Sequence, residues 1–89
     1  RALERLDVHT PLERRETVIA DLDESPAGVV LIFEGKEIRF PSQAAAELRA
    51  CFETEASFRL DELPGDLDPK GRIVLARRLV REGFLRVRR

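Results

Sequence analysis

The segment from Asp68 to Gly83 constrains the fold most strongly, because it carries both a start signal and a stop signal for one helix. Asp68 suits the N-cap position, and Pro69 stands at the first helical position, where its missing N–H costs nothing. Gly83 can adopt the left-handed conformation that commonly ends a helix. The sequence therefore predicts a helix over residues 69–82.

At 100° per residue, this predicted helix has an apolar side and a basic side. The apolar side comprises Ile73, Leu75, Ala76, Leu79 and Val80. The basic side, a candidate binding face, comprises Lys70, Arg77, Arg78 and Arg81. Val74 lies among these cations, which fits a protein contact at least as well as a DNA groove. No aromatic residue interleaves with the arginines, so the pattern favours a solvated surface over phosphate binding.

Short segments ahead of this helix predict an antiparallel β-meander. In chain order they are a strand at 17–22, a turn at 23–28, a buried central strand at 29–33, a tight turn at 34–36 and a strand at 37–40. Val18, Ala20 and Leu22 share one face of the first strand, and Ile38 and Phe40 point inward from the last.

A second helix is expected directly after the meander. Pro41 and Ser42 start it, because proline is tolerated in a first turn and serine can cap the free N–H groups. Its apolar stripe comprises Ala44, Leu48, Cys51 and Phe52. This position makes Cys51 a buried structural thiol rather than a reactive one. The remaining segments are a short strand at 58–60, a single turn at 61–65 and an edge strand at 84–88.

A helix, a short turn, a basic helix and a strand follow one another as in a winged-helix domain, a relative of the helix-turn-helix. We therefore expect an α+β fold, namely a winged-helix-like domain with an N-terminal antiparallel β-meander. The middle helix would be reduced to one turn and the wing to a few residues. This domain would span residues 16–89, with residues 1–15 as a linker or the remnant of a preceding helical region.

Length and composition point to one soluble domain. The chain has 89 residues, of which 43% are hydrophobic and 37% charged. Its longest apolar run, at residues 29–33, is far too short to cross a bilayer, and Cys51 has no partner for an internal disulfide. We expect no membrane contact and a cytoplasmic location. The first residue is Arg1 rather than methionine, which suggests a piece of a longer protein.

The net charge of −1 conceals a marked asymmetry. Residues 1–68 hold 8 basic and 16 acidic residues, whereas residues 69–89 hold 8 basic and 1 acidic. The two parts attract each other, so the acidic part can serve as an internal counter-surface to the basic one. Nucleic-acid binding has to compete with that internal pairing.

Three blocks of the sequence together resemble a known family. They are VVLIFEGKEIRFP at 29–41, FRLDELPG at 58–65 and RIVLARRLVREGFL at 72–85. They resemble the C-terminal region of bacterial cupin-type JmjC proteins, which are similar to the ribosomal-protein hydroxylases. The resemblance covers roughly residues 10–88. It implies a parent with a cupin barrel that binds Fe(II) and 2-oxoglutarate, a helical dimerisation region and a terminal winged helix, of which this chain would be the last part.

An active site within this chain is not expected. In the family that the chain resembles, a His-x-Asp pair and a distant second histidine hold the iron in the barrel. Here Asp7, Val8 and His9 stand in the reverse order, and His9 is the one histidine, so a two-histidine site cannot be built. Asp21, Asp23 and Glu24 fall in a turn but lack the ligand spacing of a calcium loop. We expect no cofactor and no metal in this chain.

Two functions follow from these patterns. The first is a non-catalytic accessory domain that makes protein contacts with the preceding cupin domain, a polypeptide substrate or a second subunit. The alternative is a nucleic-acid-binding winged helix that uses the basic helix side. Its contact residues would be Lys70, Arg77, Arg78 and Arg81, with Arg86, Arg88 and Arg89 on the rim. An independent enzyme is a third and weaker hypothesis.

Overall fold

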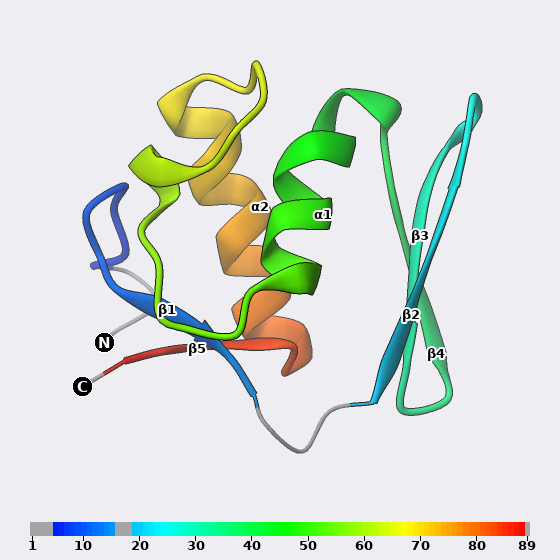
Figure 1. Cartoon of the computed structure of the whole chain (residues 1–89), viewed down its shortest axis with the longest axis horizontal. Coiled ribbons are helices and arrows are strands. Elements are labelled where there is room, and N and C mark those ends of the chain that lie inside the picture. The colour runs from blue at the N-terminus through cyan, green and yellow to red at the C-terminus, as the bar shows by residue number, and fades with distance from the viewer. Residues whose placement is uncertain (1–4, 16–18, 89) are drawn as a thin grey trace.

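The computed structural model describes residues 5–15 and 19–88 and has the expected α+β fold with an antiparallel meander (Figure 1). Its elements in chain order are β1 (Leu12–Arg14), β2 (Ala20–Ser25), β3 (Gly28–Phe33), β4 (Lys36–Phe40), the 3₁₀ turn η1 (Ser42–Ala44), α1 (Ala45–Glu53), the 3₁₀ turn η2 (Leu60–Glu62), α2 (Pro69–Glu82) and β5 (Leu85–Val87). Strands β2, β3 and β4 form one sheet, and β1 and β5 form another. Both helices lie between the two sheets.

Strand β3 is the centre of the meander, as the sequence predicts. Only alternate residues of β3 are buried, because the helices cover one face of the sheet. The buried residues are Val29, Leu31 and Phe33. Val30 and Ile32 are half-exposed, so the uninterrupted apolar run does not mark a strand buried on both faces. In the turn to β4, Glu34 and Gly35 have φ of 52° and 75°, the positive values of a tight hairpin turn.

The first meander strand differs from the prediction at both ends. Strand β2 continues to Ser25, which pairs with Gly28, so Asp23 and Glu24 lie in the strand and not in the turn. The ladder reaches this far because Pro26 and Ala27 suffice to reverse the chain. Of the predicted strand 17–22, Thr17 and Val18 lie outside the described residues.

The helix after the meander begins with η1 rather than with a serine cap. Pro41 precedes it in an extended conformation, and no side chain caps the turn. The predicted apolar stripe is confirmed: Ala44, Leu48 and Cys51 are buried and Phe52 is half-buried. The short strand predicted at 58–60 is reduced to a single bridge, in which Phe58 pairs with Leu12.

Helix α2 begins and ends where the sequence predicts. The Asp68 carboxylate accepts a hydrogen bond from the Gly71 N–H at 2.8 Å, and Gly83 has φ of 90°. The Phe84 N–H then donates to the Leu79 carbonyl at 2.9 Å, which satisfies a free carbonyl of the last turn. From α1 to β5 the elements follow the winged-helix order, with η2 in place of the middle helix.

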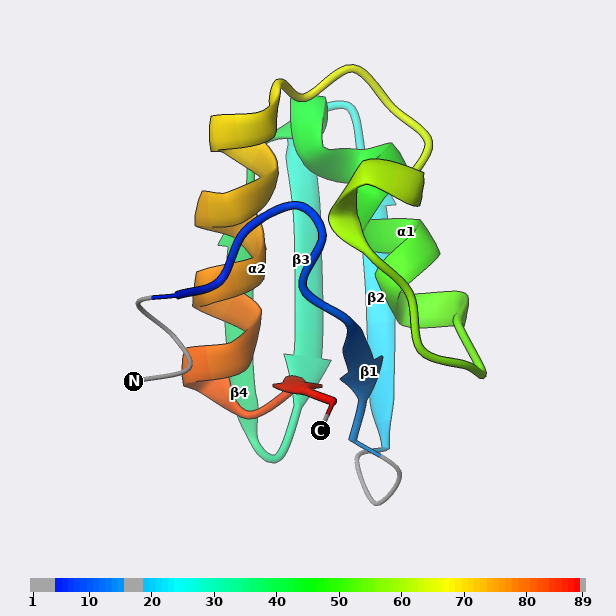
Figure 2. The ribbon, with the colours of Figure 1, turned by 90° about the vertical axis from the view of Figure 1, so that its left-hand side faces the viewer.

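Residues 5–15 are not a linker in this structure, which corrects that part of the prediction for residues 1–15; residues 1–4 lie outside the described residues. Leu6 and Leu12 are buried, and β1 pairs antiparallel with β5 (Figure 2). Strand β5 therefore finds its partner at the N-terminal end of the chain rather than in a wing. Propensity could not show this pairing, because the partners are more than 70 residues apart and the β1 pattern is only three residues long.

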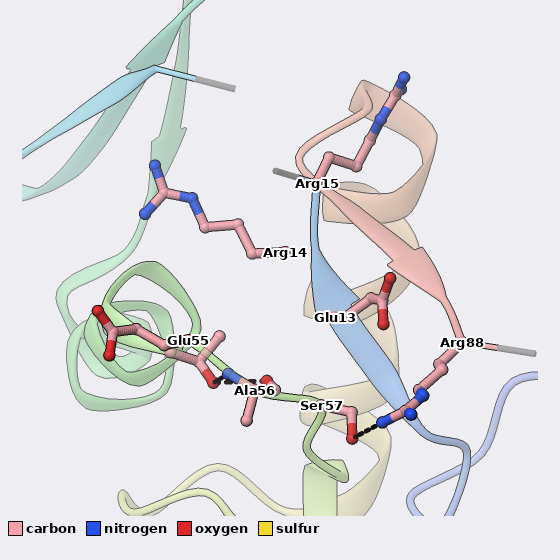
Figure 3. A pocket seen from close by; sticks show the side chains of 8 residues that line it. Glu13, Arg14, Arg15, Glu55, Ala56, Ser57 and Arg88 are labelled. Carbon is pink, nitrogen blue, oxygen red and sulfur yellow. Dashed lines mark hydrogen bonds between the residues drawn. The ribbon is translucent and has the colours of Figure 1, made fainter. Parts of the chain in front are cut away.

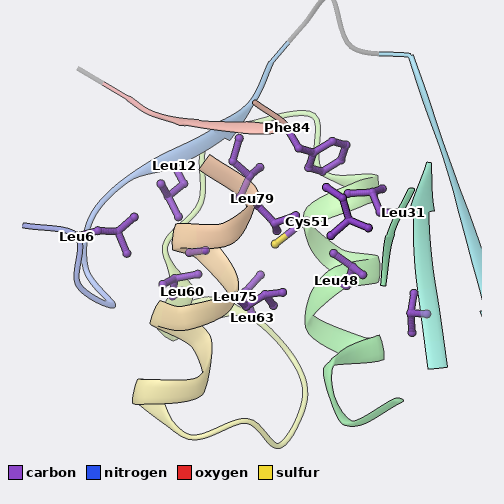
Figure 4. Close-up of a cluster of buried hydrophobic side chains, with 14 of the residues drawn as sticks. Leu6, Leu12, Leu31, Leu48, Cys51, Leu60, Leu63, Leu75, Leu79 and Phe84 are labelled. Carbon is purple, nitrogen blue, oxygen red and sulfur yellow. The ribbon is translucent and has the colours of Figure 1, made fainter. Parts of the chain in front are cut away.

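The core fills the space between the meander, the two helices and the β1–β5 sheet (Figure 4). Its buried side chains come from β1, β3, β4, α1, η2, α2, β5 and the connecting segments, and partly buried residues of β2 pack against them. Phe84 is fully buried, and its ring centroid lies 5.5 Å from that of Phe33 on the meander. This contact packs the segment directly after α2 against the sheet, so it helps to fix the C-terminal end of the helix.

Candidate functional site

Helix α2 presents the candidate binding face to the outside. Leu75, Ala76 and Leu79 are buried against the core, and this fixes the rotation of the helix about its axis. Opposite them lie Lys70, Val74, Arg77, Arg78 and Arg81, which we call the basic face. The predicted apolar back and cationic front are therefore confirmed.

The four cations of the basic face differ in how far they are already paired. Lys70 and Arg81 are exposed, and neither forms an ion pair within residues 5–15 and 19–88. Arg77 is half-buried, and its covered Nε has no hydrogen-bond partner among the described residues. Arg78 donates to Glu82 at 3.0 Å. The accessible charge therefore centres on Lys70, Arg77 and Arg81.

Glu82 ties the end of α2 to the meander. Its carboxylate takes the hydrogen bond from Arg78 and lies 3.5 Å from Lys36 Nζ, and these cations lower the pKa of Glu82. Lys36 also donates to the Glu82 carbonyl at 2.8 Å. A cation at this C-terminal end of α2 interacts favourably with the helix dipole. Arg78 and Lys36 thus stabilise the fold through Glu82 and are less available to bind a partner.

The centre of the basic face is apolar. Val74 is 65% exposed, although the other valines of the described chain are buried or half-buried. Exposure of one aliphatic side chain is ordinary on a protein surface, but here Val74 lies among Lys70, Arg77 and Arg81, which have no ion pair within the part of the chain that the structure describes. The face therefore combines a small hydrophobic contact with positive charge.

The rim arginines predicted for nucleic-acid binding have partners elsewhere. Arg86 on β5 forms an ion pair with Glu13 on β1, and Arg88 donates to the Ser57 hydroxyl at 2.8 Å. Arg89 lies outside the described residues. Arg86 and Arg88 therefore belong to the β1–β5 sheet and its surroundings and do not extend the basic face.

A groove of about 590 Å³ lies between β1, the segment after α1 and Arg88 (Figure 3). Its lining residues are Glu13, Arg14, Arg15, Thr54, Glu55, Ala56, Ser57 and Arg88. Arg14 donates to the Phe52 carbonyl, and its guanidinium lies over the Phe52 and Phe84 rings. Carboxylates and guanidinium groups both line the groove, and several are held by neighbours, so it lacks a converging set of donors for an anion.

Sequence patterns missed a buried ion pair that positions α2. Glu47 on α1 is 0% exposed and lies 3.6 Å from Arg72 on α2. Its other contact is the Leu67 N–H, which donates to Oε2 at 2.8 Å. The Arg72 guanidinium also donates to four backbone carbonyls, those of Leu60, Leu63, Gly65 and Leu67. Arg72 thus ties η2 and the connection after it to α2.

The groups most often involved in catalysis are committed to structure. Burial, helped by the charge of Glu47, raises the pKa of Cys51 to about 12, so the thiol is not a nucleophile near neutral pH. His9 is exposed, and its Nδ1 lies 3.1 Å from the Asp61 carboxylate. Within the described residues, no group of three His, Cys, Asp or Glu side chains could hold a metal ion.

The meander has an outer face that neither helix covers (Figure 1). The pairing register places two rows of residues across it, Asp21–Ile32–Glu37 and Asp23–Val30–Arg39. Ile19, one residue before β2, is 90% exposed. We call these seven residues the outer sheet face. The prediction that Asp21, Asp23 and Glu24 share a turn is wrong, because all three lie in β2, Asp21 and Asp23 on the outer face and Glu24 on the opposite one.

Comparisons with known proteins add no relative: no family model, curated protein or solved structure matches this chain. The resemblance to cupin-type JmjC proteins therefore stays a prediction. In the part of the chain that the structure describes, no helix has both the length and the apolar character needed to cross a membrane.

Proposed function

We propose that this domain is a non-catalytic interaction domain whose basic face binds an acidic segment of another polypeptide. One observation carries the proposal: an exposed Val74 lies among Lys70, Arg77 and Arg81, which have no ion pairs within the described residues. Unpaired cations attract an acidic partner over several ångströms, and the valine provides apolar area that is removed from water on contact.

Protein fits this face better than nucleic acid does. A helix that reads DNA usually works with further phosphate contacts from neighbouring elements. Here Arg86 and Arg88 are held by Glu13 and Ser57 instead. Nucleic-acid binding remains the second candidate, because the unpaired cations of α2 could also meet phosphates.

We further propose that the domain works within a larger Fe(II)- and 2-oxoglutarate-dependent oxygenase, as an accessory to its cupin barrel. The order of elements from α1 to β5 supports this, since the resemblance implies a terminal winged helix. This chain holds one histidine, so the iron ligands would belong to the barrel. A His-x-Asp pair and a later histidine on the same polypeptide would support the parentage, and their absence would contradict it.

The binding test uses an acidic amphipathic peptide of alternating glutamate and leucine, duplex DNA and single-stranded RNA as separate probes. Titration into the ¹⁵N-labelled domain at about 50 mM and about 300 mM salt should show peptide binding that weakens with salt. The largest changes in amide chemical shift should occur at the residues around Val74. The variant Lys70→Glu with Arg81→Glu should lose at least about tenfold in affinity, because it reverses the two exposed cations of this face that have no ion pair within the described residues.

The matched control is Arg49→Glu with Arg88→Glu. It introduces the same change in charge at two exposed arginines that belong neither to the basic face nor to the outer sheet face. Equal losses in the two variants would mean that only net charge matters and would contradict a specific face. Salt-sensitive binding of DNA or RNA without peptide binding would make the nucleic-acid candidate the correct one.

A further inference from the structure

The two most exposed large hydrophobic side chains of the described chain lie on two different charged surfaces. Val74, 65% exposed, is at the centre of the basic face. Ile19, 90% exposed, is beside the carboxylates of the outer sheet face. Each surface thus combines an apolar contact with charge, and the two charges have opposite sign. A pair of surfaces of this kind is complementary.

The outer sheet face is acidic along its exposed β2 edge. Asp21 and Asp23 lie on edge strand β2, are exposed, and have no ion pair within residues 5–15 and 19–88. On β4, by contrast, Glu37 lies 3.4 Å from Arg39, so these two charges largely cancel. Val30 and Ile32 stand half-exposed between the two edges. The result is an apolar strip with a negative edge.

The two surfaces cannot neutralise each other within one molecule. Helix α2 lies on the covered side of the meander, whereas the outer sheet face is turned away from both helices (Figures 1 and 2). The charge asymmetry of the chain is therefore only partly satisfied internally, by pairs such as Arg72 with Glu47 and Arg86 with Glu13. The remaining cations of the basic face and the remaining carboxylates of the outer sheet face point to solvent on different sides of the domain.

We infer that the outer sheet face of one copy binds the basic face of a second copy, so that the domain associates head to tail. This inference rests on the proposed function, since it names a further copy of this chain as one acidic partner of the basic face. Two different patches meet, so a pair of copies keeps one free face of each kind and the assembly grows unless the rotation closes a ring. The contact is small and charged, so it is expected to be weak and salt-sensitive.

Sedimentation velocity on the 89-residue domain provides the test. Between about 10 μM and about 1 mM protein at low salt, the mean mass should rise steadily beyond a dimer, and about 500 mM salt should abolish the rise. One variant, Asp21→Lys with Asp23→Lys, destroys the acidic edge. Another, Lys70→Glu with Arg81→Glu, destroys the basic face. Each variant alone should stay monomeric.

Mixing two uncharged variants distinguishes this contact from any other. They are Asp21→Asn with Asp23→Asn and Lys70→Gln with Arg81→Gln, because two charge-reversed variants would also attract each other through their altered faces. Each retains the face that the other has lost, so an equimolar mixture should form a 1:1 complex and no larger species. Circular dichroism checks that every variant folds. A monomeric wild-type domain, association that survives in either variant, or a mixture that stays monomeric would each overturn the inference.

The acidic peptide separates this inference from the proposed function. Peptide binding without self-association leaves the basic face as a binding surface and refutes only the second copy as its partner. Self-association without peptide binding refutes the general acidic-peptide proposal and identifies the chain itself as the ligand. When both occur, the peptide should dissociate the assemblies by competing for the basic face.

Discussion

Replacing Arg72 by methionine should destabilise the domain more than any exposed arginine replacement. Its side chain is 12% exposed and donates to four backbone carbonyls beside the fully buried carboxylate of Glu47. Methionine keeps much of the volume but leaves these acceptors without a donor. Breaking one partner of a buried ion pair costs about 3–5 kcal/mol, because the other charge stays buried and unpaired.

This cost is a large share of the stability of so small a domain. At roughly 0.05–0.15 kcal/mol per residue, a chain of 89 residues has a free energy of unfolding of roughly 4–13 kcal/mol. Urea denaturation followed by circular dichroism should show the midpoint of Arg72→Met lowered by roughly 2 M. Its m-value should stay unchanged if the native state remains compact.

Two controls make the result specific. Arg59→Met removes an exposed arginine whose ion pairs with Asp61 and Glu62 lie at the surface, so it should cost less than about 1 kcal/mol. The double variant Glu47→Leu with Arg72→Met should cost about 1–3 kcal/mol less than the sum of its single changes, because neither charge is then left alone. If Arg72→Met costs no more than Arg59→Met, the buried pair does not hold the connection before α2 and our account of it is wrong.

Three further predictions concern single side chains. Cys51 should react with a thiol reagent at pH 8 roughly 1000-fold more slowly in the native domain than in urea. The reason is that a pKa of about 12, against the ordinary 9.0, lowers the thiolate fraction at this pH by that factor. Equal rates in the two conditions would show that the thiol is accessible in the native domain. Asp68→Ala should lower the free energy of unfolding, measured by urea denaturation, by about 1 kcal/mol, because it removes the N-cap of α2. Asp68→Asn keeps a capping oxygen and should lower it much less. Equal losses of stability in the two variants would exclude capping as the cause. Arg78 and Lys36 lower the pKa of Glu82, so its contribution to stability is present above its ordinary value of 4.5 and is lost as the pH falls through the lower folded pKa. The urea midpoints of wild type and Glu82→Gln should therefore differ at pH 6 and converge toward pH 3, and a difference that grows on acidification would contradict this sign.

Local sequence signals determined much of the architecture. The limits of α2 follow from Asp68, Pro69 and Gly83, whose effects act within one turn of the helix. The tight hairpin at Glu34 and Gly35 and the rotation of α2 were also predictable. These features depend on backbone preferences and on periodicity, which a window of a few residues already contains.

Only the tertiary structure decided which of these elements meet and which surfaces remain open. The pairing of β1 with β5 joins the two ends of the chain, and the burial of Glu47 depends on Arg72, 25 residues further along. A charged residue on a predicted helix is expected in water, so no local pattern could reveal this pair. The exposure of Ile19 and the half-exposure of Val30 and Ile32 likewise follow from helices that cover one face of the meander only. Contacts between distant segments set these properties, and the physical reason is that burial belongs to the packed assembly rather than to the residue.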